Sequence, residues 1–86
     1  MGDLIERGLN RFAQKRTNDL TEALINNGSL PFGGEFNDRN FAIRGITGIF
    51  ESCHALKKCG SVTEEEAGKI LDELVKRGLF KEKTGS

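Results

Sequence analysis

The sequence has no net charge, because 13 basic side chains balance 13 acidic ones over its 86 residues. A neutral chain has no general attraction for nucleic acid or anionic membranes, and it offers little repulsion against self-association. The chain also lacks any apolar run near the roughly 20 residues that a membrane span needs. Its first ten residues lack the basic and apolar regions of a secretory signal. These absences predict a protein that is neither membrane-bound nor secreted.

Cysteine, histidine and proline are scarce, with two, one and one residues respectively. In one continuous helix, Cys53 and Cys59 would lie about 9 Å apart along the axis, which exceeds the roughly 7 Å limit for a disulfide. We therefore expect two free thiols and a reducing, cytoplasmic setting. Cys53 and His54 project about 100° apart on a helix, and no fourth zinc ligand accompanies them. We expect no metal and no other cofactor.

Catalytic patterns are also missing. The sequence holds no defensible Ser–His–acid pattern, no phosphate-binding glycine loop and no paired carboxylates in a recognisable arrangement. The single histidine adjoins a cysteine on a predicted helix and therefore faces away from the thiol, which disfavours a cysteine nucleophile. A chain of this length is small for an enclosed active site. We predict that the protein is not an enzyme, has no catalytic residues and takes no small-molecule substrate.

The apolar residues predict an all-α fold, since they recur at helical spacing in three segments. These segments are residues 3–27, 38–59 and 63–77. The second is the most apolar, and we predict that it is the central helix. We expect one domain over residues 1–86, with three helices in an orthogonal or bundle-like arrangement. A fourth helix results if the first one breaks near Thr17, where polar residues interrupt its apolar stripe. That stripe is expected to face the core and consists of Ile5, Leu9, Phe12, Ala13, Leu20, Ala23 and Leu24.

The strongest local signal begins the third helix. Thr63 and Glu66 have the spacing of a capping box, and residues 64–66 place three glutamates at the positive end of the helix dipole. Gly78 is placed to close this helix, with Leu79 or Phe80 making the accompanying hydrophobic contact.

One loop and one tail are also predicted. Residues 28–37 contain three glycines and the single proline, which prevent regular structure. The loop carries Leu30, Phe32 and Phe36, so we expect it to fold back onto one end of the helices. The tail over residues 81–86 is expected to fray, although residues 79–83 also suit a short strand.

A face of small residues is the first candidate site. Gly45, Gly48, Ser52 and Ala55 fall on one side of the second predicted helix, at i, i+3, i+7 and i+10. An interior glycine costs a helix roughly 0.5–1 kcal/mol against alanine, so two of them indicate that another backbone approaches closely. That backbone belongs either to a helix of the same chain or to a second protein. The second interpretation makes this face a protein-interaction site.

A basic stripe is the second candidate site. Positive side chains recur every four residues along the first helix, and others extend the stripe if the helices align; the set is Arg7, Arg11, Lys15, Arg16, Arg39 and Arg44. The stripe is either a solvated face or a contact surface for phosphates or an acidic partner.

Residues 61–80, SVTEEEAGKILDELVKRGLF, resemble the last helix of winged-helix DNA-binding domains, which often ends in Leu-x-x-(Lys/Arg)-Gly-Leu. The resemblance implies a helix that enters the major groove of DNA. Two features depart from this pattern. The three glutamates at the start of the helix repel phosphates, and only eight residues follow Gly78, which are too few for the usual two-stranded wing.

The sequence therefore predicts a non-enzymatic protein-interaction module, such as a small adaptor, an inhibitor or a subunit of a larger assembly. Its partner is another protein or a second copy of itself. The alternative is a nucleic-acid-binding regulator with a winged-helix-like or helix-turn-helix-like C-terminal half. The zero net charge and the three glutamates favour the first function, whereas the basic stripe and the ending at Gly78 favour the second.

Overall fold

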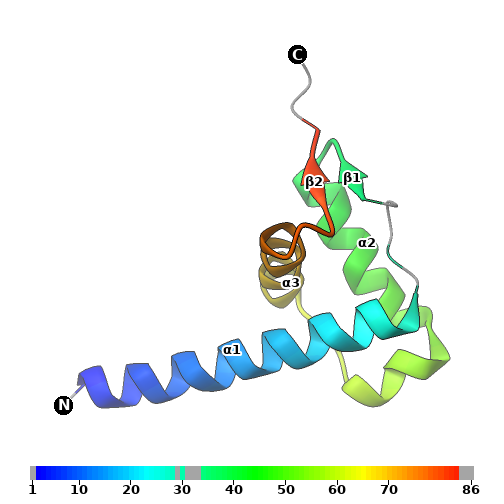
Figure 1. Cartoon of the computed structure of the whole chain (residues 1–86). Helices are drawn as coiled ribbons and strands as arrows, with labels where there is room; N and C mark the ends of the chain where they lie inside the picture. Colours follow the sequence, from blue (N-terminus) through cyan, green and yellow to red (C-terminus); the bar gives the residue numbers. More distant parts are fainter. Residues whose placement is uncertain (1, 29, 31–33, 84–86) are drawn as a thin grey trace.

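Figure 1 shows a computed structural model of the chain, which describes the backbone of residues 2–28, 30 and 34–83 and, within these, the side chains from residue 11 onward. The elements, in order, are α1 (Gly2–Asn27), β1 (Glu35–Phe36), α2 (Arg39–Ser52), the 3₁₀ helix η1 (His54–Cys59), α3 (Glu64–Lys76) and β2 (Lys81–Glu82). The predicted all-α class is confirmed. Within the described ranges, no helix is long and apolar enough to cross a membrane.

The first helix does not break near Thr17, because α1 continues through this stretch to Asn27. Thr17 and Thr21 are both buried, and the Thr21 hydroxyl donates a hydrogen bond of 2.7 Å to the Thr17 carbonyl. Polar residues therefore face the interior here, and the Thr21 hydroxyl finds its hydrogen-bond acceptor within the helix. This explains why an interrupted apolar stripe does not interrupt the helix.

The prediction of one continuous helix over residues 38–59 is wrong. α2 ends at Ser52, and Cys53 adopts an extended conformation with φ −80° and ψ 117°. The Cys53 carbonyl then accepts the amides of Leu56 and Lys57, which starts η1. This turn brings Leu56, which is 3% exposed, into the core. The burial of Leu56 gives a physical reason for a change of direction that no glycine or proline marks.

The centre of the fold is α3 and not the second helix. α3 packs against both α1 and α2, and Figure 1 shows it almost end-on between them. Its buried positions recur at helical spacing and are Ala67, Gly68, Ile70, Leu71 and Leu74. The predicted capping box is confirmed, since the Thr63 hydroxyl accepts the Glu66 amide and the Glu66 carboxylate accepts the Thr63 amide.

The loop before α2 and the segment after α3 meet in a two-stranded parallel sheet, where Glu35 pairs with Lys81 and Phe36 with Glu82. The start of the tail is therefore a strand and not frayed. Phe36 is buried and Leu30 packs against the core, as expected for the loop, while Phe32 and residues 84–86 lie outside the described residues.

Candidate functional site: the exposed side of α1

The N-terminal part of α1 extends past the rest of the molecule, which Figure 1 shows in blue. The radius of gyration is 13.7 Å, against about 12 Å for a compact domain of this length. The solvent-accessible area is 6070 Å², about 1,000 Å² more than the roughly 5,000 Å² expected for a folded monomer of this mass. The chain thus exposes an unusual amount of surface, and α1 contributes to it.

Phe12 is 76% exposed, although the sequence predicted that it faces the core. It lies at one end of a groove of about 340 Å³ between α1 and η1, here called the α1 groove. The residues that line this groove are Phe12, Lys15, Arg16, Asp19, Leu20 and Cys59. On a helical wheel Phe12 lies about 120° from the buried Leu24. That angle was the signal in the sequence that Phe12 points away from the core.

Four charged residues follow one another on the solvent side of α1. Arg11 and Lys15 come first, and Asp19 and Glu22 follow them; all four are exposed. In the part of the chain that the structure describes, none of them forms an ion pair. The side chain of Arg7, the first member of the predicted basic stripe, lies outside the described residues. The exposed side of α1 therefore carries a basic segment and then an acidic one.

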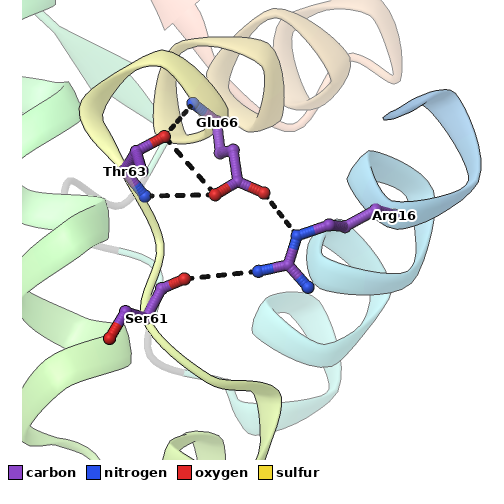
Figure 2. Close-up of polar contacts among 4 residues, drawn as sticks. All are labelled: Arg16, Ser61, Thr63 and Glu66. Carbon is purple, nitrogen blue, oxygen red and sulfur yellow. Dashed lines mark hydrogen bonds and ion pairs between the residues drawn. The ribbon is translucent and has the colours of Figure 1, made fainter. Parts of the chain in front are cut away.

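Arg16 differs from these four, because it joins α1 to the start of α3 (Figure 2). Its guanidinium donates to the Glu66 carboxylate and also to the Ser61 carbonyl at 3.3 Å. Glu66 is also the acidic member of the capping box with Thr63. The charge of Arg16 is thus balanced within the fold, and Arg16 links α1 to the start of α3.

The ionisation of Glu66 makes the stabilising effect of this cluster depend on pH. The hydrogen bond from Arg16, with further help from the Thr63 amide and against the effect of burial, lowers the pKa of Glu66 from its ordinary value of 4.5. Because the folded carboxyl releases its proton more readily than the unfolded one, its contribution to stability is fully present above pH 4.5 and is lost as the pH falls through the lower folded pKa.

We therefore expect Glu66→Gln to destabilise the protein at neutral pH and to have little effect in acid. The Arg16 and Glu66 side chains are 44% and 28% exposed, so solvent screening limits the effect to about 1 kcal/mol or less. Urea denaturation at about pH 7 and about pH 3 measures the difference. Glu65→Gln, at an exposed position of the same turn, is the control. An equal loss of stability at both pH values would contradict the role given to the Glu66 charge.

Two further residues of the predicted basic stripe, Arg39 and Arg44, lie on α2. Arg39, at the start of α2, makes an ion pair of 2.8 Å with Asp72 of α3 and donates to the Gly68 carbonyl at 3.4 Å. Its hydrogen bond to Asp72 raises the pKa of Arg39. Arg44 is exposed on α2, beside a small depression that also includes Glu64. Arg16 and Arg39 therefore serve to hold α1 and α2 against α3.

The small-residue face is divided by the break after α2. Gly45 and Gly48 are half-buried on α2 and Ser52 is exposed at its end, whereas Ala55 lies beyond Cys53 in η1. A Cβ atom added at Gly48 would meet no other atom within 4 Å. No described part of the chain therefore requires a glycine at this position.

Gly48→Ala is accordingly expected to stabilise the fold by about 0.5–1 kcal/mol, because alanine favours the helix and fits the open space. Thermal or urea denaturation measures this gain. Gly60→Ala is the control, since Gly60 has φ +86° and an alanine there is strained. Destabilisation by Gly48→Ala would show that a close neighbour occupies this position.

The cysteines and the histidine do not converge on a site. Cys53 and Cys59 are free and half-buried, and the Cys53 thiol donates to the Asn27 side-chain oxygen at 3.5 Å. His54 is exposed at the start of η1. Among the residues that the structure describes, no three His, Cys, Asp or Glu side chains gather as metal ligands.

Comparison with known proteins adds no relative. No protein family matches the chain, and no curated protein or solved structure matches it significantly.

Proposed function

We propose that the protein is a non-enzymatic protein-interaction module, acting as an adaptor, inhibitor or subunit, that docks through the α1 groove and the adjoining exposed side of α1. The observation that carries this proposal is the exposure of Phe12 at the end of the groove. An aromatic side chain that is buried on binding contributes about 1.5–3 kcal/mol. Aromatic and arginine residues also dominate the energetic centres of protein interfaces.

The floor and rim of the groove fit this function. Leu20 and Cys59 continue the apolar surface from Phe12, and Lys15 and Asp19 supply charge on the rim. An apolar centre with a polar rim is the usual anatomy of a protein–protein contact. The α2 face with Gly45 and Ser52 stays a second candidate contact, because the space at Gly48 is open. We assign the protein to the cytoplasm, since two free cysteines fit a reducing compartment.

Site-specific photo-cross-linking tests the docking surface. A photoreactive phenylalanine analogue replaces Phe12 in one chain and Phe41 in another, within cells that make the protein. Phe41 is a matched control, because it is 62% exposed on a different helix. We expect a discrete adduct from position 12 and none of the same mass from position 41. The proposal fails if position 12 gives no adduct or if both positions give the same one.

Nucleic-acid binding is the second candidate, supported by the resemblance of residues 61–80 to a winged-helix segment and by the exposed Arg11 and Lys15. The exposed side of α3 begins with Glu64 and Glu65, which weighs against contact with phosphates. A gel-shift assay with duplex DNA at low salt, where non-specific binding is strongest, is decisive. We expect the protein not to retard the DNA. Retardation would favour nucleic-acid binding over protein interaction as the function.

A further inference from the structure

We propose that α1 of a second copy of this chain occupies the exposed side of α1, packed antiparallel to the first. This inference rests on the proposed function and names its partner. Three observations support it, namely the order of charges along α1, the position of Phe12 and the amount of exposed surface.

The order of charges is self-complementary. Arg11, Lys15, Asp19 and Glu22 lie within about 80° of arc on α1. When a perpendicular two-fold axis relates two antiparallel helices, residues on one flank of the first helix lie opposite residues on the same flank of the second. With this axis near Arg16 and Thr17, Arg11 lies opposite Glu22 of the second copy, and Lys15 lies opposite Asp19. The two-fold symmetry repeats both pairs, so four ion pairs form from residues that have no ion-pair partner in the described monomer.

The apolar residues agree with the same register. Phe12, exposed on the side of this arc nearest the groove, lies beside Ala23 of the second copy, and Ala23 is half-buried in the monomer. Arg16 approaches the axis in both copies, but Glu66 already balances its charge. The arc lies on the side of α1 away from the buried Thr17, Thr21 and Leu24. The packing of α1 on α3 therefore leaves this side open.

The exposed area suits a dimer. The whole chain exposes about 1,000 Å² more than a compact monomer of its mass, which leaves room for the roughly 800 Å² that each partner buries in a standard protein interface. The net charge of zero offers no general repulsion between two copies. In this register, residues 7–10 of each α1 lie opposite residues 23–27 of the other, which gives this part of the projecting helix the tertiary support that most helices need.

The test uses two complementary variants of the full chain. One carries Arg11→Glu with Lys15→Asp, which makes the flank acidic, and the other carries Asp19→Lys with Glu22→Arg, which makes it basic. All four positions are exposed, so both variants are expected to fold, and circular dichroism checks this. Sedimentation equilibrium gives the mass of each chain alone and of an equimolar mixture.

We expect the wild type to form a dimer, each variant alone to dimerise at least about tenfold more weakly, and the mixture to restore the dimer as a heterodimer. The mixture restores it because every charge then faces an opposite one. A wild type that stays monomeric at high concentration overturns this inference. The proposed function is then still tested by cross-linking, in which an adduct between position 12 and another protein would support it. Variants that dimerise alone as well as the wild type, or a mixture that stays monomeric, also overturn it.

Discussion

Phe50→Ala is expected to destabilise the protein by about 3–5 kcal/mol, the usual cost of removing a large aromatic side chain from a packed core. Phe50 is only 1% exposed and lies on α2 in the core cluster with Ile46 and Leu71. Small domains have a total stability of about 5–15 kcal/mol, and a chain of this length lies toward the lower end. We therefore expect Phe50→Ala to be partly unfolded at room temperature, as urea denaturation followed by circular dichroism would show.

Phe41→Ala is the matched control, because it removes the same side chain from the same helix at a position that is 62% exposed. We expect a loss of about 1 kcal/mol or less, since an exposed side chain leaves no cavity. Equal losses at positions 41 and 50 would contradict the orientation of α2.

Phe80→Ala has the second largest expected effect, about 3–4 kcal/mol. Phe80 follows α3, is 2% exposed, and packs edge-to-face on Phe36 with ring centroids 6.2 Å apart and planes at 79°. This contact joins the segment after α3 to the loop before α2. Loss of the Phe80 ring removes packing from the core. It also removes support from the β1–β2 pair, in which the Lys81 amide donates to the Gly34 carbonyl and the Lys83 amide to the Phe36 carbonyl.

Hydrogen exchange separates these two consequences of Phe80→Ala. We expect the Lys81 and Lys83 amides to lose protection before the α3 amides do, because two-residue strands depend on their neighbours. Leu79→Ala, at a position 37% exposed, is the control and should leave both amides protected. Unchanged protection in Phe80→Ala would show that the sheet does not depend on the pair of rings.

Helix ends with a chemical signature could be predicted from the sequence. Thr63 and Glu66 mark the start of α3 through the hydrogen bonds that they form. Gly78, with φ +77°, follows the end of α3, where the Gly78 amide donates to the Val75 carbonyl and the Leu79 amide to the Leu74 carbonyl. These signals act over four or five residues, so the sequence contains them in full.

Features that depend on tertiary contacts could not be predicted in this way. The extended Cys53 has no glycine or proline beside it, and the direction of η1 is tied to the burial of Leu56. Residues 79–83 suit a short strand in the sequence, but the pairing of β1 with β2 leaves no signal there, because two-residue strands are too short to alternate and their partners lie far apart in the chain. The most apolar segment is also not the central one: α3 is central because helices pack on both of its sides.

The candidate surface was partly foreseen. The basic stripe points to α1, but the sequence does not distinguish Arg16, which forms an ion pair with Glu66 across 50 residues, from Arg11 and Lys15, which stay exposed. Phe12 was assigned to the core because its spacing from Leu9 and Ala13 is helical. The angle of about 120° between Phe12 and Leu24 is contained in the sequence, but the packing of α1 on α3 decides which of the two sides is covered.

The central claim is that two copies of the chain dock through the exposed side of α1, and sedimentation equilibrium of Phe12→Ser, Phe41→Ser and the wild type tests it most directly. The account predicts twice the single-chain mass of 9.5 kDa for the wild type and for Phe41→Ser at high concentration, and the single-chain mass for Phe12→Ser. A Phe12→Ser variant that associates as strongly as the wild type, or a wild type that never exceeds the mass of one chain, would contradict it.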